Sequence, residues 1–276
     1  MRRPLVALCL LAPALAAADS TVLGAELLGR LNPRGLAVEA SVMRRLPVPD
    51  EESPLRRGRY LALGALADVN PAWAQLGPRL EWVPWAPVQL AAGYDLIAFY
   101  GANGSLLRLD SDRARYGAGE LRALRSAERS GLAHRLFVEP ALRARLGRLL
   151  LRSALELSAY RLAGRAGTYY ESDHDLLVRE RDLVLRLRTI APVALWREGD
   201  VERLLLGPAH EYAAAARTGV SRHRLGAVLL LSPWPRRWGL DRPRLGAFGG
   251  ILLADRNRRG QPFVLLSLAA DLDWPD

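Results

Sequence analysis

The chain has 276 residues, of which 50% are hydrophobic and 25% charged, and its formal net charge is +10. Its 39 basic residues are all arginine, which together with many Ala, Leu, Gly and Pro residues is typical of a GC-rich genome and does not indicate a nucleic-acid partner. Cys9 is the only cysteine, so disulfides, thiolate catalysis and thiolate metal sites are excluded from the chain after that residue.

The N-terminus is typical of a secretory signal peptide. Arg2 and Arg3 precede an apolar stretch at 5–15, and small residues at 16–18 follow. We predict cleavage after Ala18, so that residues 1–18 are the signal peptide and residues 19–276 form one mature domain. No later apolar run approaches the roughly 18 residues that a membrane helix requires.

Twelve runs of alternating polar and apolar residues follow, separated by turn residues such as those at 32–35, 70–71 and 218–219. A period of two is the pattern of β-strands. Most runs exceed the about 5 or 6 residues of a usual soluble strand and are long enough to cross about 25 Å of hydrocarbon when tilted. In chain order, the predicted strands are 22–31, 34–45, 58–69, 74–84, 87–109, 133–146, 148–160, 182–196, 203–216, 221–232, 244–254 and 262–273.

The alternation also assigns two faces to each strand. In 133–146, Arg135, Glu139 and Arg143 share one face, and the opposite face is apolar. An arginine that faces lipid near the bilayer midplane costs about 2–4 kcal/mol. We therefore expect the charged faces to line the lumen of a closed barrel. A soluble lipocalin-like barrel is a further alternative, in which the apolar faces would point inward; the direction of Arg143 and Arg152 discriminates the two.

The pattern resembles the outer-membrane β-barrel proteins of Gram-negative bacteria over essentially the whole mature length. The resemblance implies an all-β fold, a single antiparallel up-and-down transmembrane barrel of about twelve strands, in the bacterial outer membrane. It also implies outer-membrane lipids and the barrel-assembly machinery as partners. With the C-terminus in the periplasm, the long segments 110–132 and 161–181 lie outside the cell.

Two interpretations of the charged lumen remain open. An arginine-rich wall favours a narrow passive channel with anion preference and a small anionic solute as its cargo, because rings of arginine select anions. Arginine–carboxylate pairs would instead close the interior and leave a structural or surface-interaction barrel. The predicted lumen residues are Arg135, Glu139, Arg143, Arg145, Arg148, Arg152, Glu156, Arg186, Arg188, Arg222 and Arg224.

Aromatic residues near strand ends are typical of the girdles that membrane barrels place at both membrane interfaces. The predicted girdle residues are Trp82, Trp85, Trp196, Trp234, Trp274, Tyr100, Tyr160 and Tyr212.

Ser221 and His223 lie two apart on the predicted lipid-facing side of one strand, an arrangement similar to that of outer-membrane phospholipases. A membrane-embedded lipid hydrolase is therefore a further alternative. Such a pair needs an acid or amide to orient the base, and none suggests itself on a neighbouring strand. We accordingly predict no catalytic residue.

An acidic cluster of Glu171, Asp173, His174 and Asp175 falls in a predicted outer loop. Oxygen-rich clusters can hold Ca²⁺, but this one lacks the glycine and the ligand spacing of a dedicated calcium loop. We expect a solvated loop, with no metal site and no cofactor.

Overall fold

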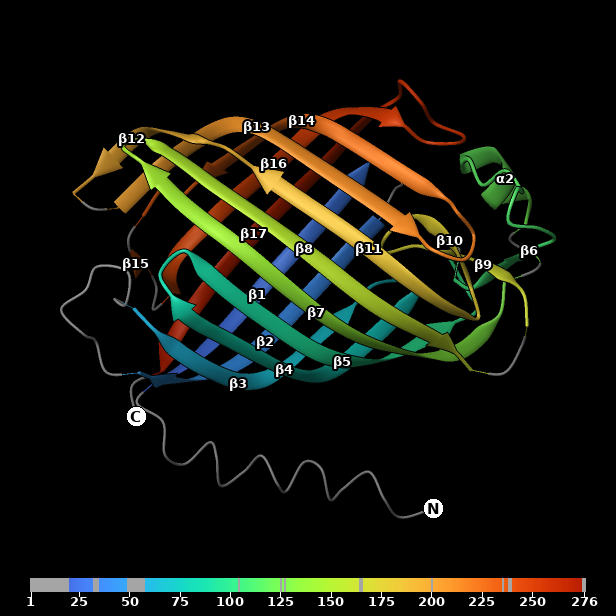
Figure 1. Cartoon of the computed structure of the whole chain (residues 1–276), viewed down its shortest axis with the longest axis horizontal. Helices are drawn as coiled ribbons and strands as arrows, with labels where there is room; N and C mark the ends of the chain where they lie inside the picture. Colours follow the sequence, from blue (N-terminus) through green and yellow to red (C-terminus); the bar gives the residue numbers. More distant parts are fainter. Residues whose placement is uncertain are drawn as a thin grey trace, which may run out of the picture.

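The computed structural model describes residues 20–31, 35–48, 58–103, 105–124, 126, 128–163, 166–199, 201–234, 236–237 and 240–274. Within these residues, twelve long antiparallel strands form one closed barrel (Figure 1). Neighbours in sequence are paired, and the last strand closes the barrel on the first, from Thr21 opposite Trp274 to Leu31 opposite Val264. The strands are β1 (Ser20–Leu31), β2 (Gly35–Pro47), β3 (Tyr60–Val69), β4 (Trp73–Trp85), β5 (Val88–Tyr100), β7 (Ser130–Leu146), β8 (Leu149–Leu162), β11 (Arg181–Ile190) with its continuation β12 (Val193–Glu198), β13 (Val201–Ala215), β14 (Ser221–Leu231), β16 (Leu240–Ala254) and β17 (Pro262–Trp274).

The predicted all-β class and the single antiparallel barrel are confirmed, and each of the twelve predicted strands is present. The predicted strand 87–109 is too long, because β5 ends at Tyr100. Gly101, Asn103 and Leu106 have positive φ angles and turn the chain away from the barrel wall. The remaining residues form β6 (Leu107–Leu109), which belongs to a different sheet. The predicted signal peptide lies outside the described residues.

β11 and β12 are one barrel strand with an interruption. Ile190 pairs with Ala209 and Val193 pairs with Leu206, so both pieces follow the same register on β13. Pro192 lies in the gap and has no N–H to donate to a ladder. Gly207 permits the close approach of the chains there, since a Cβ at this position would lie 2.4 Å from the Cα atom of Pro192.

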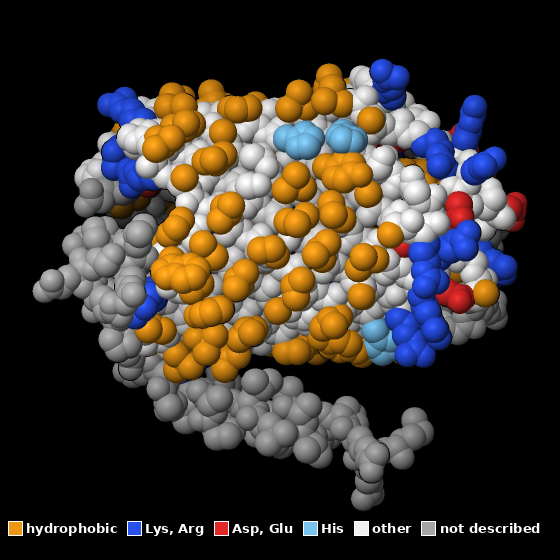
Figure 2. Space-filling view, viewed as in Figure 1, with side chains coloured by type: hydrophobic (Ala, Val, Ile, Leu, Met, Phe, Trp, Pro, Cys, Tyr) orange, Lys and Arg blue, Asp and Glu red, His pale blue; other side chains and the backbone are white. Residues whose placement is uncertain are grey.

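The outer face of the barrel is apolar. Large side chains such as Leu136, Leu183 and Leu206 are exposed on it, whereas Arg135 and Glu211 on the alternate positions are buried inside. Figure 2 shows hydrophobic side chains spread over the barrel wall, with arginines gathered at its ends. A soluble barrel with an apolar interior has the opposite arrangement, so the lipocalin-like alternative is wrong. Among the described residues, no helix is long and apolar enough to cross a membrane.

The two ends of the barrel differ. The end at which β1 begins and β17 ends, on the left in Figure 1, also carries the short β15 (Arg236–Arg237) and is here called the inner end. The opposite end, here called the outer end, carries β6, the short helix α2 (Ala118–Ala123), β9 (Thr168–Glu171) and β10 (Leu176–Arg179). The two long segments predicted to lie outside the cell are therefore at the same end of the barrel.

Candidate functional site: an inward-folded hairpin and its ion pairs

The segment between β8 and β11 folds back as a hairpin. β9 and β10 are antiparallel, from Leu176 opposite Glu171 to Arg179 opposite Thr168, and β6 adds a third strand. Almost every residue of the two strands is buried, including Leu176, Leu177 and Val178. A loop strand with no exposed face must be enclosed by the rest of the barrel, so the hairpin occupies the lumen at the outer end.

An apolar core surrounds the hairpin. Barrel strands contribute lumen-facing residues from their outer ends, and the β5–β7 connection contributes Leu106, Leu107 and Tyr116. Burial of a large apolar side chain is worth about 1.5–3 kcal/mol, so this packing favours the inserted hairpin. The barrel residues of this core are Trp73, Ile97, Phe99, Ala133, Tyr160, Leu162, Val184, Ala213 and Ala215.

The hairpin tip, residues 171–175, contacts strands on different sides of the barrel. Arg30 of β1 donates to the carbonyl oxygen of Asp173 at 3.0 Å, and Arg135 of β7 pairs with the carboxylate of Asp173 at 3.2 Å. The indole N–H of Trp73 in β4 donates to the hydroxyl of Ser172 at 3.0 Å. These contacts extend across the lumen and hold the tip within it.

Asp175 has a cluster of arginines around its carboxylate. Oδ2 lies 3.0 Å from Arg222, 2.7 Å from Arg258 and 3.5 Å from Arg224. Tyr170 donates its hydroxyl to Oδ1 at 2.8 Å, and Asp175 is completely buried. Burial opposes its ionisation, but Arg258, Arg222 and Arg224 hold the pKa of this carboxyl below its ordinary value.

Glu211 of β13 joins the same network from the barrel wall. It accepts hydrogen bonds from Arg222 at 2.6 Å, Arg186 at 2.8 Å and Arg224 at 3.1 Å. The hairpin and the wall therefore share the same arginines, and removal of either carboxylate would leave buried cations without full compensation.

His174 is also completely buried at the tip. Nδ1 lies 3.0 Å from a carboxylate oxygen of Glu171, and Nε2 lies 3.4 Å from a carboxylate oxygen of Glu156 in β8. Burial disfavours the imidazolium, but the interactions with Glu156 and Glu171 and the charge of Asp173 outweigh it and raise the pKa of His174 to about 9. The histidine is therefore cationic at neutral pH and binds the tip to the wall.

The stability of the inserted hairpin tip should depend on pH. Because the pKa of His174 is raised from 6.5 to about 9, its stabilising contribution is fully present below pH 6.5 and is lost as the pH rises through about 9. We expect the protection factors for amide hydrogen exchange of residues 169–178 to fall across that window. The variant His174→Gln should show no such fall, and constant protection in the unsubstituted chain would contradict the role of this histidine.

The acidic cluster was expected to be a solvated loop, and that expectation is wrong. Glu171, His174 and Asp175 are buried in the lumen, where hairpin insertion supplies cationic partners that the local sequence does not contain. Within the described residues, no group of three or more His, Cys, Asp or Glu side chains is arranged to hold a metal ion.

The predicted lumen residues fall into three sets. Arg135, Glu156, Arg186, Arg222 and Arg224 belong to the network around the hairpin tip. Glu139 lies nearer the inner end and is paired with Arg152 and Arg188. Arg143 lies opposite Arg152, Arg145 pairs with Glu202 at 2.7 Å, and Arg148 lies in the turn between β7 and β8.

The predicted girdle residues are distributed over both ends. Trp82, Trp85, Trp196 and Trp234 are exposed, as is Tyr100 near the outer end. Tyr212 is partly buried and packs on His223, with ring centroids 4.5 Å apart. Trp274 ends β17 at the inner end.

Tyr160 is not an interfacial residue, and its assignment to the girdle is wrong. It has the same strand parity as Glu156 and Ser158, so its ring points into the lumen and is only 3% exposed. Its hydroxyl lies 3.1 Å from Nδ1 of His174 and accepts from Arg135 at 3.3 Å. Parity decides the direction of a strand side chain, even close to the strand end.

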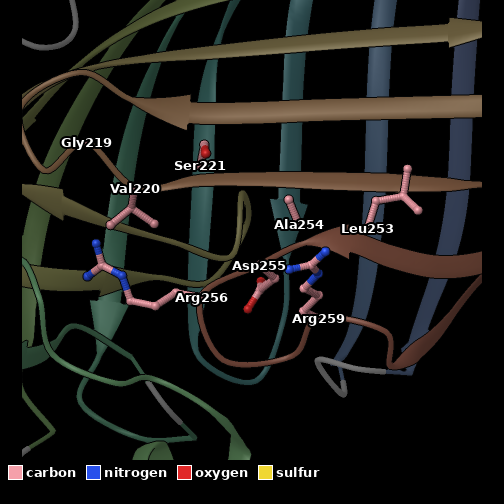
Figure 3. Close-up of a pocket in the computed structure, with 8 residues that line it drawn as sticks. All are labelled: Gly219, Val220, Ser221, Leu253, Ala254, Asp255, Arg256 and Arg259. Atoms are coloured by element: carbon pink, nitrogen blue, oxygen red, sulfur yellow. The ribbon is translucent and has the colours of Figure 1, made fainter.

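Ser221 lies at an open pocket of about 530 Å³ at the outer rim (Figure 3). His223 is not part of the lining but lies opposite Ala254, which is. Ser221, Leu253 and Ala254 line the pocket together with Arg256 and Arg259 from the β16–β17 connection. His223 packs against the rings of Tyr212 and His210.

The carboxylate of Asp255, which lines this pocket, already has hydrogen-bond partners. Asp255 accepts from the backbone N–H groups of Asn257 and Arg258 and pairs with the Arg258 guanidinium at 3.0 Å. His223 therefore has aromatic neighbours, and the Asp255 carboxylate stabilises a turn.

No protein-family model and no curated protein matches the sequence. Among solved structures, the chain is similar to the β domain of the Bordetella autotransporter BrkA, with 13% identity over 92% of this chain and 97% of that chain and a TM-score of 0.48. It is similar to the KdgM porin, with 7% identity, 91% and 99% coverage and a TM-score of 0.45. It is also similar to OccAB1 of Acinetobacter baumannii, with 7% identity, 92% and 96% coverage and a TM-score of 0.42. At these values the likenesses carry no argument, and the assignment as an outer-membrane β-barrel rests on the closed barrel and its apolar outer face.

Proposed function

We propose that this chain is an outer-membrane barrel whose lumen is closed to ions in the described conformation, with its biological role carried by its outer surface. The observation that supports this most strongly is the hairpin tip, which is bound inside the lumen by Arg30, Trp73, Arg135 and Arg222 from four different strands. The proposal includes export by a signal peptide cleaved after Ala18 and insertion by the barrel-assembly machinery.

A gated anion channel is the second candidate. The hairpin supplies Asp173 and Asp175, which neutralise arginines that belong to the barrel wall. If the hairpin leaves the lumen, Arg135, Arg222 and Arg224 lose these carboxylates and the wall becomes more positive. An arginine-lined pore attracts anions. The same residues that close the barrel therefore predict the selectivity of its open state.

Planar-bilayer recordings test both candidates. We expect the unsubstituted chain to give no stable conductance steps. Replacement of residues 168–179 by a Gly-Ser segment of equal length should produce conductance, with anion selectivity that weakens as salt screens the wall. Replacement of residues 118–123, which removes α2 and leaves the contacts of the tip in place, is the matched control and should stay closed.

Each candidate has its own contrary outcome. Steady conductance of the unsubstituted chain would contradict the closed barrel. Cation selectivity of the hairpin-replaced variant would contradict the anion channel, and no conductance in that variant would show that the residual wall closes the lumen without the hairpin.

A further inference from the structure

A row of basic side chains crosses three adjacent strands near the outer end. His134 of β7 lies opposite Arg161 of β8, and Arg161 lies opposite Arg181 of β11. Each residue is next in sequence to a buried, lumen-facing one, namely Arg135, Tyr160 and Asp182. Successive residues of a strand point to opposite faces, so the basic row faces outward at one level of the barrel.

The row lacks compensation by the chain itself. Arg161 and Arg181 are exposed, and neither forms an ion pair with any residue in the described parts of the chain. His134 has its Nδ1 2.5 Å from the hydroxyl of Tyr94, which is a neutral partner. Arg161 and Arg181 are like charges placed directly opposite on neighbouring strands, an arrangement that is destabilising. The arrangement therefore favours an anion bound across the strands.

An apolar row lies directly beneath the basic one. Two residues toward the inner end on each strand, Leu136 lies opposite Ala159, and Ala159 lies opposite Leu183. Leu136 and Leu183 are among the exposed large hydrophobic residues. Two residues of a strand span about 7 Å. The outer surface therefore changes from basic to apolar over about the length of one lipid headgroup. Figure 2 shows arginines at the outer end beside the apolar wall.

We propose that His134, Arg161 and Arg181 form a binding site for the phosphate groups of an anionic lipid in the outer leaflet, with its acyl chains on Leu136 and Leu183. Clusters of basic residues at a membrane surface attract anionic headgroups with roughly 1 kcal/mol per residue. The apolar row adds contact that a soluble anion cannot use, which favours a lipid over free phosphate. The inference rests on the membrane location and is independent of whether the lumen is closed.

Native mass spectrometry of the folded barrel in detergent micelles tests the site. With bis-phosphorylated lipid A as the probe, we expect the unsubstituted chain to retain the lipid and to prefer it over phosphatidylcholine. The double variant Arg161→Gln/Arg181→Gln should bind the lipid with an affinity at least roughly tenfold lower. Arg115→Gln/Arg122→Gln removes the same charge from an exposed outer loop and should bind as the unsubstituted chain does.

Further variants separate charge from folding and lipid from soluble anion. Heat-modifiable mobility reports whether each variant is folded, and Arg161→Lys/Arg181→Lys should fold and retain the lipid. If the double Gln variant does not fold, the single Arg161→Gln variant takes its place and should still lose affinity. Equal loss in the Arg115/Arg122 control, equal binding of phosphatidylcholine, or displacement of the lipid by inorganic phosphate would each overturn the proposal.

Discussion

Leu187→Arg is expected to prevent stable insertion of the barrel. Leu187 lies in the middle of β11, opposite Leu155 on one side and Tyr212 on the other, with the parity of the lipid-facing surface. A lipid-facing arginine costs about 2–4 kcal/mol at the midplane and much less near the interfaces. Leu151, which lies close to the inner end of β8, should therefore tolerate the same change better. Heat-modifiable mobility and resistance of the membrane fraction to carbonate extraction measure the outcome.

Arg152→Leu is the matched control for this substitution. Arg152 points into the lumen, where it shares Glu139 with Arg188. Its loss leaves the carboxylate paired with Arg188, so we expect nearly normal assembly. Equal tolerance of Leu187→Arg and Arg152→Leu would mean that the two faces have been assigned in the wrong sense.

The alternation of side chains was sufficient to predict the barrel. In β7 and β8, charged residues such as Arg135, Glu139 and Arg152 occupy one face at nearly every position, and leucines occupy the other. In a membrane, a barrel wall accommodates both faces, with the charged face toward the lumen and the leucine face toward lipid. The pairing of each strand with its sequence neighbour follows from short connections. The pattern did not predict the end of β5, because the strand ends where the backbone conformation changes at Gly101 while the apolar pattern continues beyond it.

The inward-folded hairpin was not predicted, although a signal for it exists. Ile97, Phe99 and Val184 occupy the lumen parity near the outer ends of their strands, where an aqueous channel would carry polar residues. The loop itself contains the run Leu176–Val178, which is unusual for a solvated segment. No sequence periodicity links the apolar lumen residues at the strand ends to the apolar run of the loop. Only the closed barrel brings these two apolar groups together, so the local sequence indicates each group but does not predict the contact between them.

Asp175→Asn is expected to release the hairpin and to lower the stability of the outer half of the barrel. The substitution keeps the shape of the side chain but removes the charge that faces Arg222, Arg224 and Arg258. Removal of one partner from a buried ion pair costs about 3–5 kcal/mol, because the remaining charge stays buried without compensation. Urea unfolding of the refolded barrel in detergent, followed by the loss of heat-modifiable mobility, gives the change in free energy.

Asp112→Asn, in the β5–β7 connection that contacts the same hairpin, provides the comparison. Asp112 pairs with Arg179 of β10, whose side chain is half exposed, and solvent screens such a pair. Exposed pairs contribute about 0–1 kcal/mol, so this variant should be nearly as stable as the unsubstituted chain. Equal destabilisation by the two substitutions would contradict the buried network as the main restraint on the hairpin.

The double variant Asp175→Asn/Arg258→Gln then separates pairing from packing. Arg258 is 3% exposed and lies 2.7 Å from Asp175, but it also pairs with Asp255, so its removal alone leaves both carboxylates with reduced compensation. If the cost of Asp175→Asn comes from uncompensated buried arginines, removing one of them should recover part of the lost stability. Substitutions in contact within one charge network typically couple by about 0.5–3 kcal/mol. Strict additivity of the two changes would instead assign the hold on the hairpin to its apolar contacts with Trp73, Phe99 and Tyr160.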